Sequence, residues 1–128
     1  MHNSPEEHLK CLVKEYLDAF ETRDLERCIS YIAPDTTIHF MEGIFQGEEA
    51  IRQWHKDRFE ADMRIQEIED IQIQADTVTV NAVIRSNRLR TWNIPHLTGY
   101  ARAKVHNGKI KELSFGLIGL YATNPAED

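Results

Sequence analysis

The chain has 128 residues, of which 41% are hydrophobic and 28% are charged, and its formal net charge is −6 with a pI near 5.5. This length and composition are typical of one globular domain with a single hydrophobic core. Nucleic-acid-binding domains are normally basic, so the acidic balance argues against nucleic acid as a partner. No apolar run approaches the roughly 18 residues of a membrane span, and the N-terminus lacks a signal-peptide pattern, so we expect a cytoplasmic protein without a membrane partner.

The first half of the chain has the periodicity of helices. A stripe at 3.6-residue spacing covers residues 9–20, and residues 4–7, Ser-Pro-Glu-Glu, form a typical helix start with Ser as the N-cap. A short second helix is expected over residues 25–32, ending before Pro34. A third helix should begin near Glu48.

From about residue 63 onward the hydrophobic period becomes two, which predicts strands. The pattern over residues 65–73 loses its parity once, as it would at a β-bulge. Asn107-Gly108 is the strongest short signal for a hairpin turn. The expected order is a strand over 36–41, a turn bracketed by Gly43 and Gly47, strands over 65–73 and 76–85, a loop over 90–96, and a hairpin of 97–105 and 109–121.

These elements predict an α+β fold in one domain over residues 1–128, with a loose tail after about residue 123. If the hairpin is uninterrupted, Tyr100 pairs with Phe115, Arg102 with Leu113, and Thr98 with Leu117. That large, partly polar face would form a pocket wall, while the opposite glycine and alanine face would lie against a helix or a partner subunit. The alternative for Arg102 is a solvated position on the outer face. Which face of the strand over 77–85 points inward stays open.

Two ionisable residues, Tyr16 and His55, occupy the centres of apolar helix stripes. Placed in one interior, they indicate a lined pocket, although plain core packing is the alternative for both. A phenol can donate a hydrogen bond to a developing enolate, and a neutral imidazole can orient that phenol. The residues expected to contact a substrate are Phe20, Phe40, Trp54, Tyr100, Arg102, Phe115 and Leu117.

Motifs for other chemistries are not found in the sequence. There is no HExxH pattern, paired cysteine set, glycine-rich phosphate loop or GxSxG elbow, and the six histidines are scattered. We therefore expect neither a metal site nor a cofactor.

The order of elements resembles that of the nuclear transport factor 2-like superfamily, in its SnoaL-like and ketosteroid-isomerase-like branch. The similarity covers nearly the whole chain and implies a cone-shaped, strongly curved, mainly antiparallel sheet closed by three helices around a deep pocket, often in a homodimer. The segments that carry the resemblance are residues 16–20 (YLDAF), 24–26 (DLE), 31–35 (YIAPD), 47–51 (GEEAI) and 108–110 (GKI).

The same resemblance implies roles for individual residues. Tyr16 falls at the oxyanion-hole tyrosine of ketosteroid isomerases, and His55 falls at a second tyrosine that hydrogen-bonds to the first. Phe40 stands where those enzymes have the general-base aspartate, and Gly99 or Tyr100 stands at their second oxyanion donor. Ketosteroid isomerisation by the usual mechanism is therefore not expected.

Three functions remain open at the level of the sequence. The first is cofactor-independent proton transfer on a hydrophobic, oxygenated small molecule, as in an isomerase, a cyclase or a dehydratase, with Tyr16 and His55 as catalytic residues. The second is a binding module that returns its small hydrophobic ligand unchanged. The third is a dimerisation module with a vestigial pocket.

Overall fold

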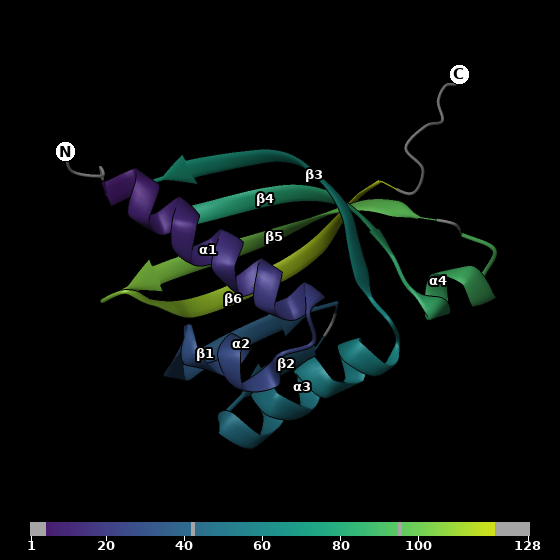
Figure 1. Cartoon of the computed structure of the whole chain (residues 1–128), viewed down its shortest axis with the longest axis horizontal. Coiled ribbons are helices and arrows are strands. Elements are labelled where there is room, and N and C mark those ends of the chain that lie inside the picture. The colour runs from purple at the N-terminus through teal and green to yellow at the C-terminus, as the bar shows by residue number, and fades with distance from the viewer. Residues whose placement is uncertain (1–4, 42, 95, 120–128) are drawn as a thin grey trace.

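The computed structural model describes residues 5–41, 43–94 and 96–119 and confirms the predicted α+β architecture (Figure 1). Ser4, expected as an N-cap, and the tail after residue 123 lie outside these residues. None of the helices within them is long and apolar enough to cross a membrane. In chain order the elements are α1 (Pro5–Glu21), α2 (Leu25–Ser30), β1 (Ile32–Phe40), β2 (Gly43–Gln46), α3 (Glu48–Glu60), β3 (Arg64–Gln74), β4 (Thr77–Arg85), α4 (Asn87–Thr91), β5 (Leu97–His106) and β6 (Lys109–Gly119).

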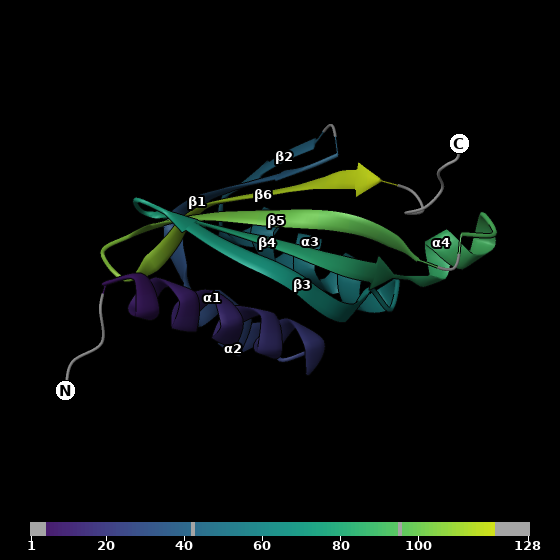
Figure 2. The ribbon, with the colours of Figure 1, turned by 90° about the horizontal axis from the view of Figure 1, so that it is seen from above.

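The strands form one six-stranded sheet in the order β2-β1-β6-β5-β4-β3. The pairing is antiparallel except between β1 and β6, which run parallel. Figure 2 shows α1, α2 and α3 on one side of this curved sheet. Helix α1 packs against β3 and β4, whereas α3 packs against β1 and β2. The interior therefore lies between α1, α3 and the concave face of the sheet.

The boundaries near β1 correct two predictions. The second helix ends at Ser30, and Ile32 begins a strand that contains Pro34. Proline is tolerated there because the β1–β6 register shifts between Ile32 and Thr37, so its missing N–H interrupts no regular ladder.

The expected turn between Gly43 and Gly47 is instead a short strand, β2, paired with β1. The chain reverses just before it, near Met41, whose φ of 56° is in the left-handed region. The expected loop over residues 90–96 is also corrected in part, since α4 extends to Thr91.

The Asn107-Gly108 turn is confirmed, with both residues at positive φ, but the register predicted beyond it is wrong. Val105 pairs with Ile110, and Lys104 then pairs with Glu112, so Lys111 is an extra residue in β6. The physical reason is burial: Ile110 and Leu113 are both almost fully buried, and their spacing of three allows both to face the core only if a bulge lies between them.

This bulge determines which residues share a face. Ala103 pairs with Leu113 and Ala101 with Phe115, so the small residues of β5 share the inner face with the large residues of β6. The orientation of β4, which the sequence left open, is also determined. Val78, Val80 and Ala82 are buried, so the valine face of the strand points inward.

Candidate functional site

Tyr16 and His55 meet in the interior, as the helix stripes predict. Tyr16 lies in the middle of α1 and is 1% exposed, and His55 lies on α3 and is fully buried. The phenol oxygen Oη of Tyr16 is 2.7 Å from Nε2 of His55. The other ring nitrogen, Nδ1, is 2.8 Å from the main-chain carbonyl oxygen of Ile51, one helical turn earlier.

These contacts determine where the protons lie. A carbonyl oxygen can only accept, so His55 Nδ1 must carry a proton and donate it to Ile51. In a neutral imidazole, Nε2 then has only a lone pair, so Tyr16 Oη donates its single proton to Nε2. In this state Tyr16 has no proton left for a substrate carbonyl, and its oxygen can only accept a further hydrogen bond.

The environment keeps both groups neutral. Burial lowers the pKa of His55 to about 4, although the hydrogen bond to Ile51 acts in the opposite direction. Burial, and secondarily the nearby Cys28, raises the pKa of Tyr16 well above its ordinary value. Both directions follow from the cost of holding a charge away from water.

An aromatic cluster surrounds this pair. Trp54 stacks on Phe115 with ring centroids 5.1 Å apart, and Phe40 meets Trp54 edge to face at 5.5 Å. Phe20 lies 6.2 Å from the His55 ring and 6.3 Å from Trp54. Within the described part of the chain, Trp54 Nε1 is a buried donor without a hydrogen-bond partner.

The cavity beside this cluster is small. Its volume is about 30 Å³, and Tyr16, Leu17, Phe20, Ile65 and Phe115 form part of its wall. None of the described residues exposes a polar atom to it. Pockets for small molecules usually measure about 300–1,000 Å³, whereas 30 Å³ is room for only one or two waters. A substrate-sized ligand therefore requires the surrounding side chains to move.

The structure brings together most of the residues predicted to contact a substrate, but it separates Leu117 and Arg102 from the others. Phe20, Phe40, Trp54 and Phe115 all lie in the aromatic cluster, whereas Leu117, which pairs with Gly99 on the inner face, is 60% exposed.

Tyr100 and Arg102 were expected to share a face with Phe115, and that prediction is wrong because of the bulge at Lys111. Tyr100 borders the cavity, but its ring lies against Gly116, and the Arg102 guanidinium stacks over that ring at 4.9 Å. Arg102 is exposed on the outer face of the sheet.

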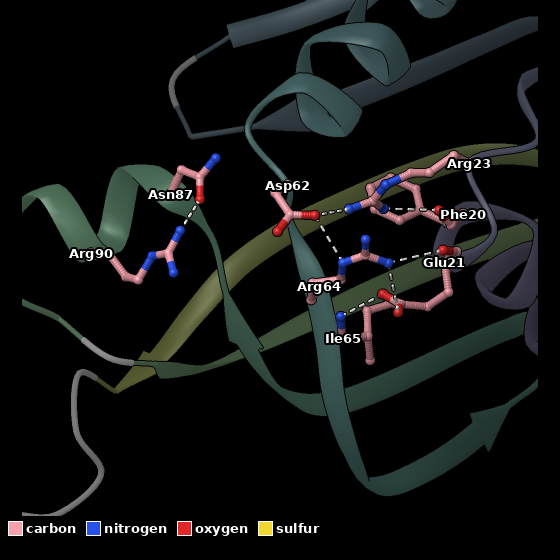
Figure 3. Close-up of polar contacts among 8 residues, drawn as sticks. All are labelled: Phe20, Glu21, Arg23, Asp62, Arg64, Ile65, Asn87 and Arg90. Carbon is pink, nitrogen blue, oxygen red and sulfur yellow. Dashed lines mark hydrogen bonds and ion pairs between the residues drawn. The ribbon is translucent and has the colours of Figure 1, made fainter.

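A polar network next to the cavity was not predicted from the sequence (Figure 3). Glu21, the last residue of α1, accepts a hydrogen bond from the main-chain N–H of Ile65 at 2.6 Å. Arg64 donates to the Glu21 carbonyl oxygen at 3.2 Å and to Asp62 at 2.9 Å, and Asp62 also accepts from Arg23 at 3.0 Å.

This network joins the end of α1 to the start of β3. The hydrogen bond from Arg23, together with Arg64, lowers the pKa of the Asp62 carboxyl group, so this group remains charged. Three of its four contacts join residues more than 35 positions apart in the chain, so no sequence pattern marks them; the fourth joins Arg64 to Asp62.

No group of three or more His, Cys, Asp or Glu side chains is arranged to hold a metal ion in the part of the chain that the structure describes.

Comparisons with known proteins agree with this fold. An enzyme, SalBIII, described as epoxide hydrolase/cyclase-like in pyran ring formation in the polyether salinomycin, is 18% identical with a TM-score of 0.77, covering 88% of this chain and 92% of that one. A protein from Kribbella flavida provisionally named a ketosteroid isomerase is 14% identical, with a TM-score of 0.75 and coverage of 94% and 84%. A provisionally named polyketide cyclase from Sinorhizobium meliloti is 21% identical, with a TM-score of 0.72 and coverage of 81% and 92%.

At these identities the structural likeness establishes the nuclear transport factor 2-like fold and not an activity. No curated protein sequence matches the chain. The model of the SnoaL-like domain family matches residues 13–113, a segment that includes Tyr16, His55 and every member of the aromatic cluster except Phe115. The chain therefore belongs to the SnoaL-like domain family.

Proposed function

We propose that this protein is a SnoaL-like enzyme that moves a proton on a hydrophobic, oxygenated small molecule without a cofactor, in an isomerisation, cyclisation or dehydration. The observation that carries the proposal is the buried hydrogen bond between Tyr16 and His55 beside an apolar cavity, whose wall includes carbon atoms of Tyr16; the relay requires the side chains that cover Tyr16 Oη to move. A neutral phenol–imidazole pair in such surroundings is more than packing requires, because leucine or phenylalanine would fill the same space without polar groups that need partners.

The proton positions support a relay in which the pair acts as a base. A substrate proton would pass to Tyr16 Oη while the phenol proton moves to His55 Nε2, and Nδ1–H would stay on the Ile51 carbonyl. Because the pKa of His55 is about 4, forming the imidazolium at pH 7 costs about 4 kcal/mol. This cost adds to that of ionising the substrate, and the two together must stay below the barrier of about 16 kcal/mol that corresponds to ten turnovers per second.

The substrate and partners follow from the same surroundings. Phe20, Phe40, Trp54 and Phe115 would contact an apolar ligand, whereas Leu117, which is 60% exposed, would contact only a part of the ligand that extends out of the interior. Trp54 Nε1 would supply a hydrogen bond to one of the ligand's oxygens. We also propose that the protein acts in the cytoplasm as a homodimer of one-domain chains, without nucleic acid or a membrane as a partner.

The alternative is a binding module that returns its ligand unchanged. Two observations favour it: the cavity holds only about 30 Å³, and no carboxylate of the described residues borders it. In this alternative, Tyr16 and His55 would serve as a buried polar contact for the ligand or for the core.

Deuterium exchange separates the two functions without requiring the natural substrate. Purified protein is incubated in D₂O with 2-tetralone, cyclohexenone and a set of β-hydroxyketones, and deuterium at the carbon next to the carbonyl is measured by NMR. The wild-type protein should accelerate exchange on at least one compound, and Tyr16→Phe should reduce that acceleration by about 10²-fold or more.

Tyr31→Phe is the matched control, because Tyr31 bonds to Arg27 and Glu15 near the surface. Equal exchange by wild-type protein and Tyr16→Phe would exclude the relay. Binding of a compound without any accelerated exchange would favour the binding module.

A further inference from the structure

A second hollow lies outside the interior, between α1 and β3. This groove has a volume of about 340 Å³. Leu17, Ile65 and Ile68 provide its apolar surface, and Ile68 is 39% exposed. The charged residues that border the groove are Lys14, Asp18, Glu21 and Glu67.

The groove and the interior cavity share a wall. Leu17 and Ile65 border both hollows, so two side chains of opposite elements stand between the outer groove and the cavity that contains Tyr16 in its wall. Leucine and isoleucine change rotamer without disturbing the main chain. With both side chains rotated aside, the two hollows would form one space within the usual range for a small-molecule pocket.

The main chain on either side of this wall is held in place. Glu21 binds the N–H of Ile65, and Arg64 binds the Glu21 carbonyl oxygen (Figure 3). Beyond Ile65, β3 has register shifts between Ile65 and Glu67 and between Ile68 and Asp70. An opening confined to side chains is therefore easier here than a movement of α1 away from the sheet.

Charge at the groove is balanced. Asp18 pairs with Arg27 at 2.9 Å, and Glu21 approaches Arg64 at 3.8 Å. The groove itself is lined by one positive residue, Lys14, and three negative ones, and the two arginines behind the rim balance two of these carboxylates. A polar but neutral rim above an apolar floor suits a ligand with an uncharged polar end.

We propose that small molecules reach the interior through this wall, and that the ligand is a neutral amphiphile whose apolar part enters the cavity while its hydroxyl or ether end stays in the groove. The proposal rests on the premise of the proposed function that the cavity receives a small molecule. It adds the entrance, its two gating residues, Leu17 and Ile65, and the chemistry of the ligand's outer end.

The test uses 1-hexanol as the probe and Trp54 as the reporter. Trp92 is 56% exposed, so the Trp92→Phe protein retains Trp54, which stacks on the cavity residue Phe115, as its one tryptophan. Association of hexanol is followed by stopped-flow fluorescence in this background. Leu17→Ala and the milder Ile65→Val thin the shared wall, and each should raise the association rate, by about ten-fold and about three-fold respectively.

Val80→Ala is the matched control, because Val80 borders the cavity but not the groove. It should change the association rate by less than two-fold. If Val80→Ala accelerates association as much as the wall variants do, or if the wall variants cause no acceleration, the proposed entrance is wrong while the proposed function stays intact. If hexanoate or hexylammonium binds more tightly than hexanol, the proposal that the outer end of the ligand is uncharged is wrong.

Failure of hexanol to bind any folded variant would overturn the proposal together with its premise. If hexanol enters through the wall but no ketone undergoes deuterium exchange, the proposed entrance is supported and the proposed enzymatic function is excluded. The two failures are thus distinguished by separate measurements.

Discussion

The two faces of the β5–β6 hairpin differ in chemistry, although they are built from alternating residues of the same strands. On the inner face, Ala101 and Phe115 pair next to the aromatic cluster and the neutral Tyr16–His55 bond. On the outer face, Arg102 pairs with Ser114 and stacks on Tyr100 in contact with solvent.

Polar groups on the two faces are stabilised by different means. On the inner face, a buried polar group without a hydrogen-bond partner lowers the free energy of unfolding. The protonation state of such a group is therefore coupled to folding. Outside, water solvates the same kinds of groups and makes their contacts weak. Changes to the buried polar pair should therefore alter stability more than changes to exposed polar contacts.

The largest effect should come from acid. His55 has a pKa of about 4 in the folded protein and an ordinary value of 6.5 when unfolded, so between these values the unfolded chain binds a proton that the folded chain does not. The free energy of unfolding therefore falls as pH falls, by about 2 kcal/mol at pH 5 and about 3 kcal/mol near pH 4. Urea denaturation at pH 7.5 and pH 5.0 measures this loss.

His55→Gln should lose less stability over the same interval, because it removes the group that titrates. His39→Gln on β1 is the matched control and should retain the wild-type loss, because His55 is still present. If His55→Gln shows the full wild-type loss, another group causes the acid sensitivity and the neutral buried imidazole is refuted.

A smaller effect should follow from Tyr16→Phe. The change removes the hydroxyl and leaves His55 Nε2 as a buried acceptor without a donor, which should lower the free energy of unfolding by about 1–3 kcal/mol. It should also raise the pKa of His55, because the neutral ring loses the hydrogen bond that favours it. Urea denaturation and an NMR titration of the imidazole measure the two effects, and an unchanged His55 titration would contradict the assigned proton positions.

Alanine substitutions at two glycines, one on each face of the hairpin, should differ in their effect on stability. A Cβ at Gly99 would lie 2.9 Å from the main-chain oxygen of Gly116, so Gly99→Ala must shift a strand and should cost about 2 kcal/mol. A Cβ at Gly116 would meet the ring of Tyr100 at 2.5 Å, but that half-buried ring can rotate outward. Gly116→Ala should therefore cost less than about 1 kcal/mol, and equal losses in urea denaturation would contradict the difference between the faces.

Much of this architecture could be predicted from local patterns in the sequence. Stripe spacing placed Tyr16 and His55 in one interior, and the Asn107-Gly108 pair located the last hairpin, because both signals depend on neighbouring residues. The bulge at Lys111 was also marked: the apolar residues Ile110 and Leu113 break parity in the same way as Ile65 and Ile68 do on β3. The prediction assumed an uninterrupted ladder between the two strands, and this assumption placed Arg102 on the wrong face.

Other features depend on distant residues and had no local signal. The bond between Glu21 and the Ile65 N–H spans 44 positions. The size of the cavity depends on how Phe20, Trp54 and Phe115 fill the same space, which is a property of packing and not of pattern. The tautomer of His55 required the position of the Ile51 carbonyl oxygen, so the direction of the Tyr16 hydrogen bond could not be assigned from the sequence.

The smallest effect should come from Arg102→Gln, which tests the corrected face assignment. The Arg102 guanidinium contacts the Tyr100 ring and lies 3.5 Å from Thr79 Oγ1, both at the surface. Its removal should change the free energy of unfolding by no more than about 0.5–1 kcal/mol, and the affinity for 1-hexanol should stay within two-fold. Phe115→Leu, on the inner face, should weaken hexanol binding several-fold, because it removes ring surface from the cavity wall. A ten-fold loss of hexanol affinity in folded Arg102→Gln would mean that this side chain reaches the ligand, and the outer position of Arg102 would then be wrong.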